Sequence, residues 1–166
     1  ATKTDAKYRS RTRNNIIDHK SGSDTKSSSP NRVVYITERL LRKVSKVGRG
    51  SMAAVRALNL HLPKRSGSRN FGKIRFLENF HFVPALRELN LSYNAISCME
   101  NFAPLSQLRD LNLAENQIGP RIEDLKSLPH LRRLNLSGNR IQTLSPGAQW
   151  RSLSRLEELR LARNEL

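Results

Sequence analysis

Four histidines and one cysteine are the side chains of this chain best suited to metal binding or nucleophilic chemistry. The histidines are scattered, and none has a second ligand at the short spacing typical of zinc sites. No nucleophile and base stand in a recognisable pattern, and the glycines form no known phosphate-binding loop. We therefore predict no catalytic residue, no metal site and no cofactor. The five residues are His19, His61, His81, His130 and Cys98.

Recognition of a partner is the chemistry that the repetition in the sequence favours. One phrase, L-x-x-L-x-L-x-x-N-x-L/I, begins at Leu86, Leu108, Leu131 and Leu156, so its copies start 22, 23 and 25 residues apart. The phrase resembles the leucine-rich repeat. That resemblance implies an α/β solenoid in which short parallel strands form the concave face, with an N-terminal helical cap.

Alternation along each strand sorts the side chains onto two faces. The leucines of L-x-L point into the coil, and the polar residues between them line the open concave face. This surface is mixed in sign and rich in asparagine, which suits a protein partner better than a nucleic acid. Solvated positions without a ligand are the alternative. The predicted partner-binding residues are Asn59, His61, Glu88, Asn90, Tyr93, Asp110, Asn112, Glu115, Arg133, Asn135, Glu158 and Arg160.

The asparagine that ends each phrase has a structural explanation. A short amide at the bend can bind backbone groups that the turn leaves unpaired. We therefore expect a ladder of Asn94, Asn116, Asn139 and Asn164. Apolar residues recur every three positions in the return segments, which predicts 3₁₀ or helical turns on the convex side. There we expect Trp150 to pack against its neighbour and Cys98 to be buried.

Residues before the first clean copy form an irregular beginning. Residues 51–85 read as a degenerate first repeat interrupted by a basic insertion after Leu62. An apolar stripe at helical spacing predicts a cap helix over residues 34–47, within a cap region of residues 33–50. Thr37 is its expected N-cap and Gly48 its expected end. Basic residues flank the stripe, so a helix on a membrane surface is the alternative.

Positive charge is concentrated at the N-terminal end. Of the formal net charge of +16, residues 1–75 carry +15, and residues 86–166 are nearly neutral regular repeats. Residues 1–32 lack the apolar content to fold, so we expect a flexible basic tail. It is either an electrostatic anchor to an acidic polymer or a solubilising or nuclear-targeting segment. The predicted anchor residues are Lys3, Lys7, Arg9, Arg11, Arg13, Lys20, Lys26, Arg39, Arg42, Lys43, Lys64 and Arg65.

The rest of the sequence indicates the cellular compartment in which the protein works. No stretch approaches the roughly 20 apolar residues that cross a bilayer, and the polar N-terminus does not resemble a signal peptide. A single cysteine excludes the disulfide-stapled caps common outside cells, which favours a reducing, cytoplasmic compartment. The last copy of the phrase stops at Leu166, so we expect the chain to be a fragment.

A closer resemblance runs through residues 34–118. The Val34-Tyr-Ile-Thr-Glu cap, the interrupted first repeat and the phrase Leu89-Asn-Leu-Ser-Tyr-Asn94 follow in the same order as in the N-terminal repeat region of centriolin and related centrosomal and ciliary proteins. The resemblance implies a non-catalytic scaffold of the centrosome, cilium or axoneme. The concave face would bind a protein, and the basic region would contact microtubules. Such proteins carry coiled coils downstream, although this chain has no heptads.

Two other functions are consistent with the sequence. One is a nuclear RNA-associated adaptor like the spliceosomal leucine-rich repeat subunit. The other is a protein-phosphatase regulatory subunit, whose binding would survive removal of the tail.

Overall fold

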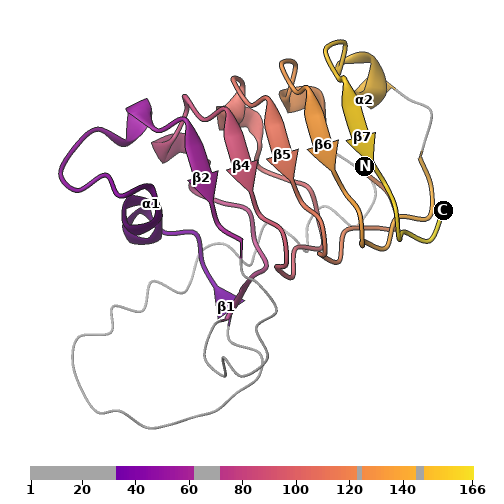
Figure 1. The fold of residues 1–166 in the computed structure, drawn as a ribbon, viewed down its shortest axis with the longest axis horizontal. Coiled ribbons are helices and arrows are strands. Elements are labelled where there is room, and N and C mark those ends of the chain that lie inside the picture. Colours follow the sequence, from indigo (N-terminus) through magenta and orange to yellow (C-terminus); the bar gives the residue numbers. More distant parts are fainter. Residues whose placement is uncertain (1–32, 62–71, 123–124, 145–147) are drawn as a thin grey trace, which may run out of the picture.

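The computed structural model describes residues 33–61, 72–122, 125–144 and 148–166. Its main feature is a curved sheet of five short parallel strands, which lie side by side along the solenoid (Figure 1). The order is β2-β4-β5-β6-β7, and each strand pairs in register with the next. The predicted solenoid is confirmed. The strands are β2 Ala57–Asn59, β4 Glu88–Asn90, β5 Asp110–Asn112, β6 Arg133–Asn135 and β7 Glu158–Arg160.

Alternation within the strands builds the core. The central leucines Leu58, Leu89, Leu111 and Leu134 are at most 4% exposed, whereas their strand neighbours are exposed or half-buried. Short helical turns cover the other side, where Phe80 and Phe102 stack with ring centroids 6.1 Å apart. The predicted convex turns are thus confirmed. They are η1 Met52–Ala54, η2 Phe80–Phe82, η3 Ala103–Leu105, η4 Leu125–Ser127 and the helix α2 Ala148–Arg151.

The expected asparagine ladder is present at all four positions. Asn116 shows the pattern: its Nδ2 donates to Leu91 O at 3.0 Å and to Leu113 O at 2.9 Å, and its Oδ1 accepts from Ile96 N at 3.1 Å. Each amide therefore joins its own turn to the preceding repeat. Asn94, Asn139 and Asn164 make the equivalent bonds.

The residue before each ladder asparagine adopts a left-handed conformation. Its φ is +61° at Tyr93, +56° at Glu115, +69° at Gly138 and +58° at Arg163. Only glycine takes this conformation without steric cost. The glycine has a second use here, because a Cβ at position 138 would stand 2.5 Å from Oε1 of Glu115. Gly138 thus leaves room for that carboxylate in the preceding repeat.

The N-terminal helix lies beside the first strand of the sheet. Helix α1 spans Glu38–Ser45 and packs against β2 (Figure 1). The Oγ1 of Thr37 accepts from Leu40 N at 3.2 Å, as expected of an N-cap. Leu41 is fully buried. The predicted end at Gly48 was wrong, because Lys46 takes the left-handed conformation directly after the helix.

Residues 33–37, where the predicted helix began, are extended instead. Strand β1 (Val33–Val34) pairs in parallel with β3 (Lys73–Ile74), and the two form a second, separate sheet. Ile36 is fully buried, and its carbonyl accepts a 2.7 Å bond from Asn79 Nδ2. A β-branched run, Val33-Val34, favours strand over helix. Thr37 is the point at which the chain turns into the helix.

Two single-residue predictions have different outcomes. Cys98 is exposed, so the expectation that it is buried was wrong. Ile96 and Met99 are the residues of that return segment that point into the core, and Cys98 lies on the outer side of the turn between them. Trp150 packs against the core while partly exposed, as expected.

The predicted flexible tail and most of the basic insertion lie outside the described residues. No helix in the described ranges has the length and apolarity to cross a membrane.

Candidate partner-binding face

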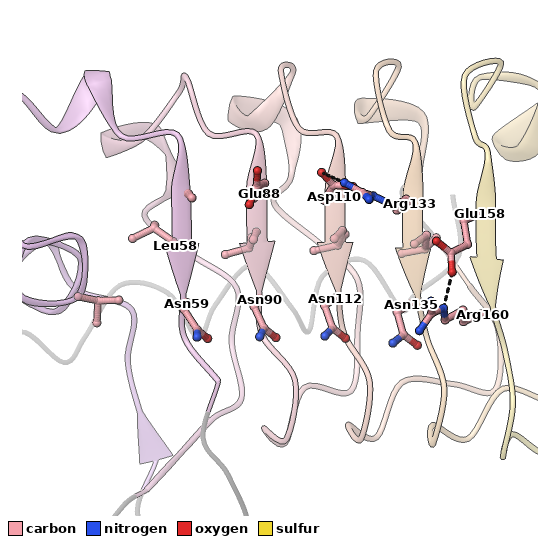
Figure 2. Close-up of a pocket in the computed structure, with 15 residues that line it drawn as sticks. Leu58, Asn59, Glu88, Asn90, Asp110, Asn112, Arg133, Asn135, Glu158 and Arg160 are labelled. Carbon is pink, nitrogen blue, oxygen red and sulfur yellow. Dashed lines mark hydrogen bonds and ion pairs between the residues drawn. The ribbon is translucent and has the colours of Figure 1, made fainter.

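A groove of about 650 Å³ runs over the concave face of the main sheet. Apart from Val44 of α1, its lining side chains stand on five adjacent strands (Figure 2). Because the strands pair in register, equivalent side chains form rows across the sheet. One row contains four asparagines and continues as Arg160 on β7, and the charged row contains Glu88, Asp110, Arg133 and Glu158. Nine of the twelve predicted partner-binding residues line this groove: Asn59, Glu88, Asn90, Asp110, Asn112, Arg133, Asn135, Glu158 and Arg160.

The asparagine row presents unused hydrogen-bond donors. Each Oδ1 accepts from the backbone N–H two residues later, at 3.0–3.1 Å in all four cases. This bond fixes the direction of the amide, and among the described residues no acceptor is recorded for the Nδ2 atoms. Figure 2 shows the four amides side by side on successive strands. The row can therefore donate to a ligand that carries oxygen acceptors. Its members are Asn59, Asn90, Asn112 and Asn135.

The charged row is mixed in sign. Arg133 binds Asp110 on the preceding strand through both carboxylate oxygens, and its Nη2 lies 3.1 Å from Oδ2. This carboxylate holds the pKa of Arg133 above its usual value. Arg160 pairs with Glu158 on the same strand. Glu88 is exposed and has no ion-pair partner in the described part of the chain.

Three predicted partner-binding residues lie beyond the strand ends and outside the groove. Nδ1 of His61 is 2.7 Å from the Oγ of Ser92, and its ring meets Tyr93 edge-on at 5.2 Å. Glu115 is half-buried, with Oε1 2.6 Å from Nη2 of Arg163. Contacts between repeats occupy these three side chains: His61 and Tyr93 join adjacent repeats, and Arg163 reaches Glu115 of the copy two before it.

Val44 of α1 lines the groove, and the sequence did not identify it. It lies on the apolar stripe of the helix, so its spacing predicted only packing.

Of the proposed anchor residues on helix α1, Arg39 and Lys43 are exposed. Arg42 instead binds Glu38 at 2.8 Å and the carbonyls of Gly48 and Gly50 at 3.1 Å each. The other proposed anchors lie outside the described residues.

Metal chemistry has no recorded site in the described residues, where no group of three or more His, Cys, Asp or Glu side chains could hold an ion. The geometry of the groove is suited to binding a partner through hydrogen bonds and charge.

Residues 70–118 match the family described as "Leucine rich repeat", and residues 106–147 match "Leucine Rich repeats (2 copies)".

Residues 70–147 thus contain leucine-rich repeats. A chain from the Drosophila melanogaster SNF/U2A′ complex is 27% identical, with a TM-score of 0.54 over 66% of this chain and 59% of the other. An internalin (inlF) from Listeria monocytogenes is 29% identical, with a TM-score of 0.49 over 56% of this chain and 27% of the other. No curated protein sequence matches significantly. This chain spans less than two thirds of the length of either of these two solved structures.

Proposed function

We propose that the leucine-rich repeats form a non-catalytic scaffold that binds a protein through the concave groove. The observation that carries this proposal is the row of four oriented asparagine amides beside charged groups of both signs. Repeat solenoids commonly bind partners on such extended concave surfaces. Backbone carbonyls and side-chain oxygens of a polypeptide would accept from the amides.

The composition of the groove favours a protein over a nucleic acid. Its lining contains no aromatic side chain, so bases find no stacking platform there. The carboxylates of Glu88 and Glu158 would also repel a phosphate backbone. A polypeptide can match both signs of charge along the groove, which adds to specificity and association rate.

Photo-crosslinking from inside the groove tests this proposal. A benzophenone amino acid replaces Asn112 in one variant and exposed Lys126 of η4 in the control. We expect protein adducts in cell extract from position 112 and few from position 126. Adding Asn90→Ala and Asn135→Ala should reduce the adducts. Equal yields from both positions, or adducts to nucleic acid alone, would contradict the proposal.

We further propose a cytoskeletal setting for this scaffold, at the centrosome, cilium or axoneme. Support comes from the charge asymmetry, since +15 of the net +16 precedes residue 76, and from the resemblance over residues 34–118. The basic region would contact the acidic surface of microtubules.

Co-sedimentation with microtubules, with and without residues 1–32, tests this cytoskeletal proposal. Binding should need the tail and fall steeply as salt rises, because the Debye length is only ~10 Å at 0.1 M. Binding that ignores salt or the tail would rule it out.

A nuclear adaptor of a protein–RNA assembly is the second candidate. It is favoured by the 27% identity to a chain of the SNF/U2A′ complex. Under this hypothesis the basic region would bind RNA in preference to tubulin. Titrating labelled RNA and tubulin against the same protein over one salt series separates the two. Tighter binding to RNA at every salt concentration would favour the adaptor.

A further inference from the structure

A column of arginines runs along one rim of the main sheet, outside the groove. Each occupies the residue immediately before the strand segment, at the second position of the repeat phrase. Backbone bonds prove the alignment, because Arg87 N donates to Arg56 O at 2.7 Å and Arg109 N to Arg87 O at 2.8 Å. Arg132 N then donates to Arg109 O at 2.8 Å. We call this column, Arg56, Arg87, Arg109 and Arg132, the arginine rim.

Most of the charge on the arginine rim is uncompensated. Arg132 pairs with Glu157, the residue at the same position of the next repeat, at 3.0 Å. Arg56, Arg87 and Arg109 have no recorded ion pair or side-chain hydrogen bond within the described ranges. Arg56 and Arg109 are exposed and Arg87 is half-buried. Like charges on adjacent strands repel one another, so an anion laid along the rim would relieve this repulsion.

We propose that the arginine rim docks an acidic helix of the partner protein. This inference rests on the proposed scaffold function, because it specifies the chemistry of the partner. The neighbouring carboxylate favours a polypeptide over a nucleic acid. Glu88 follows Arg87 and has no ion-pair partner among the described residues, so a phosphate backbone laid along the rim would run beside its negative charge. A helix can place acidic residues on its rim-facing side alone.

The spacing of the rim matches a helix better than an extended chain. Adjacent strands lie ~4.8 Å apart, so the three unpaired arginines span ~10 Å. Carboxylates at positions i, i+4 and i+7 of a helix span ~10.5 Å. Carboxylates on alternate residues of an extended chain span ~13 Å over the same number of charges. An acidic stripe on one helix face therefore meets each arginine in turn.

Binding of a designed peptide tests this proposal on the full chain. The probe is a fluorescent helical peptide with glutamates at i, i+4 and i+7, and its partner is a peptide of the same composition with those glutamates dispersed around the helix. The rim variant is Arg87→Glu with Arg109→Glu. The matched control, Arg121→Glu with Arg140→Glu, makes the same charge change at exposed arginines away from the strands. Circular dichroism confirms that both variants fold.

We expect the rim variant to bind the striped peptide at least about tenfold more weakly and the control to change affinity less than about twofold. The dispersed peptide should bind more weakly than the striped one. Equal losses in both variants, equal affinity for both peptides, or tighter binding of a single-stranded RNA that needs the rim would overturn the proposal. The groove crosslinks from position 112 test the scaffold function separately, since they do not depend on Arg87 or Arg109.

Discussion

At the scale of single residues, the ladder asparagines connect each repeat to the preceding one. Asn116, for example, binds the carbonyl of Leu113 in its own repeat and that of Leu91 in the repeat before. The asparagine recurs in each copy of the phrase because every repeat needs the same backbone groups satisfied at its bend.

The asparagine ladder predicts a large loss of stability on Asn116→Ala. The amide is 8% exposed and satisfies Leu91 O, Leu113 O and Ile96 N. Its removal leaves buried backbone groups unpaired, so the free energy of unfolding should fall by about 3 kcal/mol. Urea denaturation measures this loss. Gln117→Ala is the control, because Gln117 is the exposed neighbour and should cost less than about 0.5 kcal/mol. Similar losses in both variants would show that the ladder is not specifically stabilising.

At the scale of elements, the regular repeats were predictable and the start of the chain only in part. The L-x-L alternation identified all five strands of the main sheet, including β2 of the irregular repeat. Strand β1 was missed because its partner, β3, lies 40 residues further along the chain. A two-residue strand has no periodicity of its own, so only tertiary pairing reveals it. The asparagine that binds Ile36 O, Asn79, likewise stands outside the repeated phrase.

Helix α1 covers the first strand of the main sheet, so its removal from the core should destabilise the whole solenoid. Leu41 is its fully buried residue, and Leu41→Ala should lower the free energy of unfolding by about 3 kcal/mol through lost burial and the cavity left behind. Lys43→Ala, on the exposed side of the same helix, should cost less than about 0.5 kcal/mol. Urea denaturation of both variants checks this. A loss below 1 kcal/mol at Leu41 would mean that α1 is only loosely attached.

At the scale of the whole molecule, the register of the repeats determines where the charged side chains gather, which the net charge alone does not show. Residues 86–166 are nearly neutral in sum, so net charge predicts an electrostatic anchor only in the residues ahead of them. Stacking the repeats sorts those charges into separate rows, with Arg87, Arg109 and Arg132 aligned on one rim. Aligning the copies by their leucines would have shown this column. The groove and the rim therefore belong to the solenoid as an assembly and to no single repeat.

A solenoid in which each repeat contacts only its neighbours should lose stability unevenly along its length. Leu134 of β6 is 1% exposed between two strands, whereas Leu159 of β7 is 37% exposed at the edge of the sheet. Leu134→Ala should therefore cost about 3 kcal/mol and Leu159→Ala about 1 kcal/mol, because less apolar area is buried at the edge.

Hydrogen exchange followed by mass spectrometry makes the same comparison, first in the unsubstituted protein and then in Leu134→Ala. Amides of β7 should exchange before those of β5, since β7 is paired on one side only and opens at a lower free energy. In the Leu134→Ala protein this early exchange should extend inward to β6 while β4 stays protected. Uniform exchange across all five strands, with equal costs at Leu134 and Leu159, would instead indicate a solenoid that unfolds as one cooperative unit.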